Sequence, residues 1–193
     1  MVSEVLPCYV VCDVSLSMTD HIDELHTALR EFRGWVHADA SVGERVRCCV
    51  VGFAETARVL QPLYSVAEFT EPSTLGPGAG TNFGLAFTLL RDAIDRDVRA
   101  LKANRLRVNR PMVFFLSDGR PTDPATWPTA FAALTDPVWT ARPNMIAFGL
   151  GDADHDTLGR IGTCRTFLGR DGVRMGTALI ASVMSASPRP DHV

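Results

Sequence analysis

The sequence predicts an α/β fold: a single three-layer, doubly wound (Rossmann-like) domain with a mostly parallel central sheet, one antiparallel edge strand and helices on both faces. Two observations support this prediction. Short runs that are apolar at every position alternate with longer segments in which apolar residues recur at helical spacing. Strands without a polar face are typical of parallel sheets that helices cover on both sides. A chain of 193 residues is long enough to build one such domain around a sizeable core.

The elements follow one another in the order that this fold requires. The apolar run PCYVVCD predicts a first strand, and the apolar residues between Asp20 and His37 recur at helical spacing. The segment RVRCCVVGFA predicts a second strand, whose hairpin partner across a turn at Glu55 is the antiparallel edge strand. The loop LGPGAG precedes Thr81, which opens a helix. The buried stripe of that helix is predicted to consist of Phe83, Phe87, Leu90, Ile94, Val98 and Leu101.

The second half of the chain repeats the alternation. The run PMVFFLSDG predicts a strand that ends at a carboxylate, Asp118. After it we expect a helix at 124–134, a strand at 144–151, a short helix at 154–161, a last short strand at 166–169 and a closing helix at 176–187. The chain is therefore predicted to be one domain over residues 1–187, followed by a disordered tail at residues 188–193.

Composition and charge narrow the classes of function. The net charge of −3 gives no general attraction to nucleic acid or to an anionic membrane. The first residues do not include the positively charged segment that begins a signal peptide, and no run approaches the roughly 18 apolar residues that cross a bilayer. We therefore expect a cytoplasmic protein that binds neither nucleic acid nor membrane. The basic stretch at residues 91–110, with seven Arg or Lys against three Asp, is interpreted as a solvated helix end, with a docking surface for an acidic protein as the alternative.

The cysteines give a hypothesis about redox state. The sequence has five, all in apolar, strand-like segments: Cys8, Cys12, Cys48, Cys49 and Cys164. None forms a C-x-x-C pair of the kind that zinc sites favour. We expect all of them to be reduced, buried thiols. A zinc site that uses His21, His26 or His37 is an alternative.

Small oxygen-bearing side chains follow the predicted strands. Asp13, Ser15 and Ser17 alternate directly after the first strand, so a turning loop can aim all three the same way. Asp118 ends a later strand, and Thr81 arrives from a third loop. Since the carboxyl ends of parallel strands meet at one edge of a sheet, we expect the five to converge. Compact oxygen ligands suit Mg²⁺, with Mn²⁺ or Ca²⁺ as alternatives. Because only two of the five groups are carboxylates, a bound ion would keep positive charge and would attract a further anionic oxygen.

The motif DVSLS, followed by GAGTNFG and LSDGRPTD, resembles the von Willebrand factor A (VWA) family, whose metal-ion-dependent adhesion site (MIDAS) reads D-x-S-x-S, then Thr, then D-G. The resemblance covers about residues 5–186. It implies the VWA sheet order, direct metal contacts from Ser15, Ser17 and Thr81, and contacts from Asp13 and Asp118 that are direct or through water. Leu16 departs from the family pattern, which commonly has Gly there; this loop is less permissive and carries an apolar side chain.

Four segments are similar to one branch of this family, the bacterial VWA proteins associated with tellurite resistance (the TerY type). They are LPCYVVCDVSLSM, GTNFGLAFTLLRDAIDRDV, RPMVFFLSDGRPTD and AFGLGDADHDTL. This resemblance implies a cytoplasmic stress-response module that works with other proteins.

We therefore expect a binding module and not an enzyme, in which a divalent cation captures an Asp or Glu side chain of a partner protein. The alternatives are a metal-dependent hydrolase acting on phosphoesters and a scaffold that has lost its metal because of Leu16. No His or Glu inside the three motifs is available as a general base, which disfavours the hydrolase. The glycine-rich loop lacks the G-K-[ST] ending of a phosphate-binding loop, and GDADHD lacks the Gly and Glu of a calcium loop.

Overall fold

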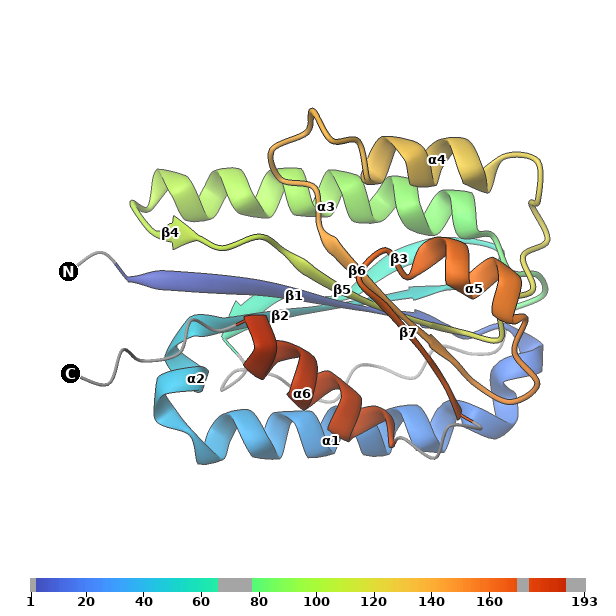
Figure 1. Ribbon diagram of the computed structural model, residues 1–193, viewed down its shortest axis with the longest axis horizontal. Helices are drawn as coiled ribbons and strands as arrows, with labels where there is room; N and C mark the ends of the chain where they lie inside the picture. The colour runs from blue at the N-terminus through green and yellow to red at the C-terminus, as the bar shows by residue number, and fades with distance from the viewer. Residues whose placement is uncertain (1–2, 66–77, 170–173, 187–193) are drawn as a thin grey trace.

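Figure 1 shows the computed structural model of the protein, which describes residues 3–65, 78–169 and 174–186. Helices lie on both faces of one central sheet. In these ranges no helix has the length and apolar character needed to cross a membrane. In chain order the elements are β1 (Glu4–Asp13), the 3-10 helix η1 (Leu16–His21), α1 (Ile22–Ala38), α2 (Ala40–Arg45), β2 (Val46–Phe53), β3 (Ala57–Ser65), α3 (Phe83–Ala103), β4 (Arg107–Val108), β5 (Met112–Ser117), α4 (Trp127–Leu134), β6 (Asn144–Gly149), α5 (His155–Ile161), β7 (Arg165–Leu168) and α6 (Met175–Ala186).

The sheet is mostly parallel. Its strands lie in the order β3-β2-β1-β5-β6-β7, and the short strand β4 pairs with the start of β1. All of these pairs are parallel except β2 with β3, which is antiparallel. Since β1, β2, β5 and β6 are parallel to one another, their carboxyl ends lie at one edge of the sheet. We call this edge, with the loops that follow these strands, the rim. The predicted fold class is confirmed.

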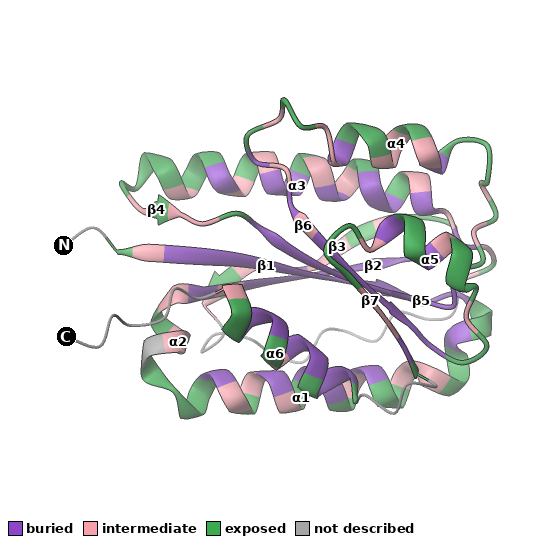
Figure 2. Ribbon diagram, viewed as in Figure 1, coloured by how far each residue is buried: buried purple, intermediate pink, exposed green. Residues whose placement is uncertain are grey.

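Two cores cover the two faces of the sheet (Figure 2). Cys8 and Val10 of β1 belong to the core under α1 and α6, whereas Tyr9 and Val11 belong to the core under α3, α4 and α5. This alternation explains why the strand is apolar at every position. The second core contains an aromatic cluster with neighbouring ring centroids between 4.9 and 6.2 Å apart: Phe53, Phe83, Phe87, Phe115, Trp127 and Phe131. The cluster fixes the start of α3, and with it the loop that carries Thr81.

The structure differs from the sequence prediction at element ends and in three short elements. The elements η1, α2 and β4 were not predicted, because each is too short to show a period. Strand β1 begins at Glu4, three residues before the predicted run. Helix α4 begins at Trp127, since residues 124–126 form a turn. The predicted tail at residues 188–193 lies outside the described residues.

The cysteines follow the prediction at four positions and contradict it at one. All five are free thiols; Cys8, Cys12, Cys48 and Cys49 are buried in β1 and β2, but Cys164 is exposed. It lies in the bend between α5 and β7, not in a core strand. Burial raises the pKa of the Cys8 and Cys49 thiols to about 12, and it also raises the pKa of Cys12 and Cys48. The four buried thiols are therefore protonated and shielded at neutral pH.

We expect only one thiol of the native protein, that of Cys164, to react rapidly with a disulfide reagent. A disulfide reagent at pH 8 should modify Cys164 at once and the four buried cysteines only after denaturation, because they are neither accessible nor ionised. The variant Cys164→Ser should lose the fast phase and still release four thiols in denaturant. Rapid native modification of this variant would contradict the burial of β1 and β2.

Candidate metal centre

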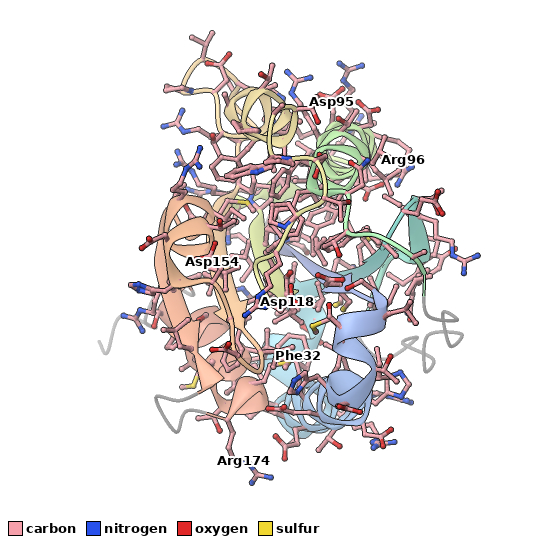
Figure 3. All side chains as sticks on the ribbon, turned by 90° about the vertical axis from the view of Figure 1, so that its right-hand side faces the viewer. Phe32, Asp95, Arg96, Asp118, Asp154 and Arg174 are labelled. Carbon is pink, nitrogen blue, oxygen red and sulfur yellow. The ribbon has the colours of Figure 1, made fainter. Side chains whose placement is uncertain are left out.

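Three loops meet at the rim, which faces the viewer in Figure 3. The first loop, residues 13–17, leaves β1. The second loop, residues 78–82, leads into α3, and the third loop, residues 117–123, leaves β5. Each loop carries part of the predicted oxygen cluster, so the three sequence motifs lie together at the rim.

The second loop is held on both sides by the other two. Gly78 N donates to Val14 O at 3.3 Å, and Leu16 N donates to Gly78 O at 3.2 Å, which ties it to the first loop. On the other side, Thr122 N donates to Thr81 O at 2.9 Å, and Thr81 N donates to the Thr122 hydroxyl at 3.0 Å. The position of Thr81 is therefore fixed by its backbone, which leaves its side chain free for another role.

The carboxylate of Asp13 is the buried centre of the first loop. It is fully buried, its Oδ1 accepts a hydrogen bond from Ser15 N at 2.9 Å, and its Oδ2 accepts one from the Ser117 hydroxyl at 2.6 Å. The hydroxyl oxygens of Ser15 and Ser17 are 3.1 Å apart. Ser15 is buried and Ser17 is exposed, so the cluster opens to solvent on the side of Ser17.

Asp118 brings a second carboxylate from the third loop. It is 8% exposed, and its Oδ1 accepts a hydrogen bond from Arg120 N at 3.1 Å. Gly119 N donates to the Ser117 hydroxyl at 3.0 Å, which closes the turn against Asp13. The charge of Asp118 is near enough to contribute to raising the pKa of Asp13.

Two glycines permit this close packing. A Cβ on Gly78 would lie 2.5 Å from the Cβ of Ala54, so no larger residue fits between the first loop and the β2–β3 turn. Gly119 has φ of +76°, and a Cβ there would lie 2.8 Å from the carbonyl oxygen of Asp154. The D-G sequence of the third loop is thus explained by the backbone conformation that the turn requires.

The structure places the five predicted ligand residues together at the rim. Direct contacts join Asp13, Ser15 and Ser17. Asp118 acts on Asp13 through its charge, and Thr81 is joined to the third loop through Thr122. Among the described residues none is hydrogen bonded to the Thr81 hydroxyl.

Three supporting residues were missed by the sequence reasoning. Ser117 holds Asp13, and Thr122 holds Thr81. Asp123 accepts hydrogen bonds from the first two backbone N–H groups of α3, at 2.9 and 2.8 Å, and so caps that helix. All three lie in the segment LSDGRPTD, but nothing in the sequence says which distant loop they bind.

We expect Thr122→Val to loosen the second loop. The change removes the acceptor for Thr81 N and should lower the free energy of unfolding by about 1 kcal/mol. Urea unfolding would measure this loss. The matched control is Thr129→Val, an exposed threonine whose side chain has no hydrogen bond within the described ranges, where a change below about 0.5 kcal/mol is expected. Equal stability of the two variants would mean that the Thr81–Thr122 bond is not important.

The residues present fit a hard divalent cation such as Mg²⁺. Burial raises the pKa of Asp13, although hydrogen bonds from Ser117 and Ser15 lower it. No Lys or Arg side chain of the described ranges forms an ion pair with Asp13 or Asp118, so a cation would offset two nearby buried charges. The described residues contain no group of three or more His, Cys, Asp or Glu that could hold a metal, so the fit depends on the hydroxyls.

The alternative zinc site has no support in the described part of the chain. His21 lies in η1, while His26 and His37 lie in α1. The last two are eleven residues apart, which is about 16 Å along a helix. These two cannot bind one ion together, and in the described ranges none of the three histidines belongs to a group of three or more His, Cys, Asp or Glu that could hold a metal.

The basic stretch at residues 91–110 forms ion pairs with neighbouring carboxylates. Within the described ranges, three of its seven Arg or Lys side chains are paired, at 2.8–3.2 Å: Arg99 with Asp95, Arg96 with Asp97 and Arg107 with Glu4. These contacts agree with the interpretation as a solvated helix end.

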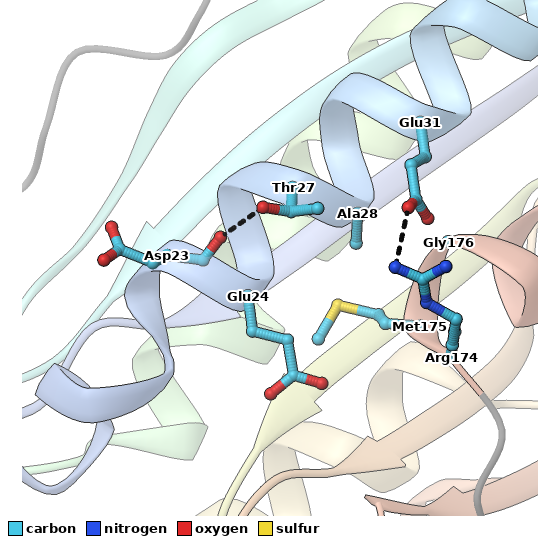
Figure 4. A pocket seen from close by; sticks show the side chains of 8 residues that line it. All are labelled: Asp23, Glu24, Thr27, Ala28, Glu31, Arg174, Met175 and Gly176. Carbon is cyan, nitrogen blue, oxygen red and sulfur yellow. Dashed lines mark hydrogen bonds and ion pairs between the residues drawn. The ribbon is translucent and has the colours of Figure 1, made fainter.

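A hollow of about 250 Å³ lies away from the candidate centre, between α1 and the start of α6 (Figure 4). Its walls include Asp23, Glu24 and Glu31, and Glu31 forms an ion pair with Arg174 at 3.3 Å. The hollow is thus lined by groups that join the two helices. It contributes no residue to the oxygen cluster.

Comparisons with known proteins identify the fold. No protein-family model matches the chain, and no curated protein matches it in sequence. Solved structures do match. Proximal thread matrix protein 1 from the mussel byssus aligns with a TM-score of 0.64 and 16% identity over 96% of this chain and 48% of its own. The pilus adhesin SpaC from Lactobacillus rhamnosus GG aligns with a TM-score of 0.69 and 14% identity over 95% of this chain and 30% of its own.

Metal is present in two related structures. One structure of the mussel protein has a zinc-occupied MIDAS motif. The TRAP protein of Plasmodium vivax, loaded with manganese, aligns with a TM-score of 0.59 and 16% identity over 95% of this chain and 75% of its own. The chain spans about half the length of the mussel protein and of a VWA protein from Sulfolobus acidocaldarius.

These neighbours are VWA-domain proteins, several of them adhesion or matrix proteins by name. At 14–16% identity the likeness establishes the fold alone. The protein therefore has the α/β fold of VWA domains, with a mostly parallel sheet and one antiparallel edge pair.

Proposed function

We propose that this domain is a protein-binding module in which a divalent cation, held by Asp13, Ser15, Ser17, Thr81 and Asp118, captures an acidic side chain of a partner. The observation that carries the proposal is the convergence of the three loops at the rim. Hydrogen bonds join Asp13, Ser15 and Ser17 there, Asp118 acts on Asp13 through its charge, and the backbone of Thr81 is bound to the third loop. Mg²⁺ is the expected ion.

The donor set explains why a carboxylate would be the captured group. Hydroxyl oxygens are neutral, so most of the negative charge around a cation here comes from Asp13 and Asp118. A cation bound there would supply positive charge to a further anionic oxygen, and Mg²⁺ prefers six oxygen ligands. The exposed side of the cluster at Ser17 is where a partner would approach.

The cellular setting is part of the proposal. The five free thiols suit a reducing compartment, which supports a cytoplasmic protein. The similarity of four segments to the TerY type supports a role in a tellurite-resistance or stress-response system. Loss of tellurite resistance in cells that carry an Asp13→Ala copy, with normal protein levels, is the expected result.

Binding can be tested with defined probes. The protein should be retained on immobilised Gly-Gly-Asp-Gly-Gly peptide in Mg²⁺ and released by chelator, while the matched Asn peptide should retain little. The Asn side chain keeps the shape and lacks the charge. Equal retention on the two peptides, with or without metal, would refute the proposal. Steady metal-dependent turnover of p-nitrophenyl phosphate, lost in Asp13→Ala, would instead indicate a hydrolase.

A further inference from the structure

We infer that the partner presents its captured carboxylate next to a large apolar residue, and that Leu16 is the surface that this residue contacts. The inference rests on the proposed function and names the partner's chemistry. It starts from an unusual exposure: Leu16 is 60% exposed although it stands between two residues of the oxygen cluster, Ser15 and Ser17.

The backbone of Leu16 is fixed, so its side chain cannot withdraw into the core. Leu16 N donates to Gly78 O at 3.2 Å, and Leu16 O accepts a hydrogen bond from the Thr19 hydroxyl at 2.7 Å. The next apolar residue along the chain, Met18, is fully buried and fills the space beneath the loop. Leu16 therefore stands at the rim as a preformed apolar contact.

The open side of the cluster coincides with Leu16. Asp13, Ser15, Thr81 and Asp118 are each at most 8% exposed, whereas Ser17 is exposed. A carboxylate that reaches the cluster from solvent must come in beside Ser17. Its neighbours in the partner chain then lie against the leucine.

The charges of the rim decide what those neighbours are. Asp20 in η1 and Glu55 in the β2–β3 turn are exposed, and neither forms an ion pair with a residue of the described ranges. Asp152 is already neutralised by Arg120, whose Nη2 is 3.0 Å from its carboxylate. Acidic flanking residues would therefore be repelled by Asp20, and by Glu55 where Arg58 in the same hollow does not offset it, so uncharged apolar neighbours are favoured.

Three immobilised peptides of one length test this: Gly-Leu-Asp-Leu-Gly, Gly-Gly-Asp-Gly-Gly and Gly-Glu-Asp-Glu-Gly, each in Mg²⁺. We expect the leucine peptide to bind about tenfold more tightly than the glycine peptide, because it covers the exposed apolar surface of Leu16. The glutamate peptide should bind more weakly than the leucine peptide. Leu16→Ala should abolish the advantage of leucine and keep Mg²⁺ affinity in calorimetry unchanged.

Met184→Ala is the matched control, since Met184 is also 60% exposed but lies near the end of α6 that is distant from the rim. It should keep the preference for leucine. Mg²⁺-dependent binding of all three peptides without such a preference, a preference that survives Leu16→Ala, or tightest binding of the glutamate peptide would overturn this inference alone. If no Asp peptide binds in an Mg²⁺-dependent way, the proposed function fails with it.

Discussion

Millimolar Mg²⁺ is expected to raise the melting temperature of the wild-type protein, and Asp13→Asn is expected to remove the increase. A cation that binds only the folded state at a hundredfold excess over its dissociation constant stabilises that state by about 2.7 kcal/mol. For a chain of this size the shift would be about 5–10 °C. Thermal unfolding in Mg²⁺ and in chelator measures the effect.

The behaviour of Asp13→Asn in chelator separates a metal site from an ordinary buried carboxylate. Asn keeps the shape of the side chain and can still accept the hydrogen bond from Ser15 N, but it removes a fully buried charge. Without metal, this variant should therefore be at least as stable as the wild type. In Mg²⁺ the order should reverse. The protein with the higher melting temperature would then be Asp13→Asn in chelator and the wild type in Mg²⁺.

The control for this reversal is Asp20→Asn, which removes an exposed carboxylate from η1 and should leave the Mg²⁺ increment intact. A wild type that melts at one temperature in Mg²⁺, Mn²⁺ and chelator, with no heat of binding in calorimetry, would refute the metal site. Loss of the increment in both variants would point to general charge screening.

The fold could be predicted because its signals are local. A fully apolar run such as PCYVVCD has few uses other than a buried parallel strand, and the stripe from Phe83 to Val98 has helical spacing and is buried as predicted. Leu101, the last member of that stripe, is only half-buried and lies in the last turn of α3. Local pattern therefore predicted the elements well and their ends less well.

The candidate centre could be predicted only in part, because much of it depends on contacts between distant segments. The five oxygen groups were found because each follows a strand or precedes a helix. Ser117 and Thr122 were not found, since their roles come from partners that are 104 and 41 residues away. Cys164 was misplaced for the opposite reason: a short apolar context suggested a strand where the chain makes a bend.

Thr81→Val is expected to weaken metal-dependent capture of an acidic peptide strongly while the protein stays folded. Both hydrogen bonds that hold Thr81 to Thr122 use its backbone, so the valine side chain leaves them intact. Valine also has nearly the same shape as threonine, and the hydroxyl that it removes has no hydrogen bond within the described residues. Stability in chelator should therefore change little.

The effect on binding follows from the ligand count. The proposed centre has five oxygen groups, of which three are hydroxyls. Loss of the Thr81 hydroxyl would leave one coordination position without a protein ligand. Both Mg²⁺ affinity and peptide capture should therefore weaken at least about tenfold. Thr88→Val is the matched control, because Thr88 is an exposed threonine of α3 whose hydroxyl donates to Gly84 O at 2.8 Å. Calorimetry with Mg²⁺ and retention on Asp peptide would compare the three proteins. Undiminished capture by a folded Thr81→Val protein, with chelator also without effect, would mean that partners bind at another surface.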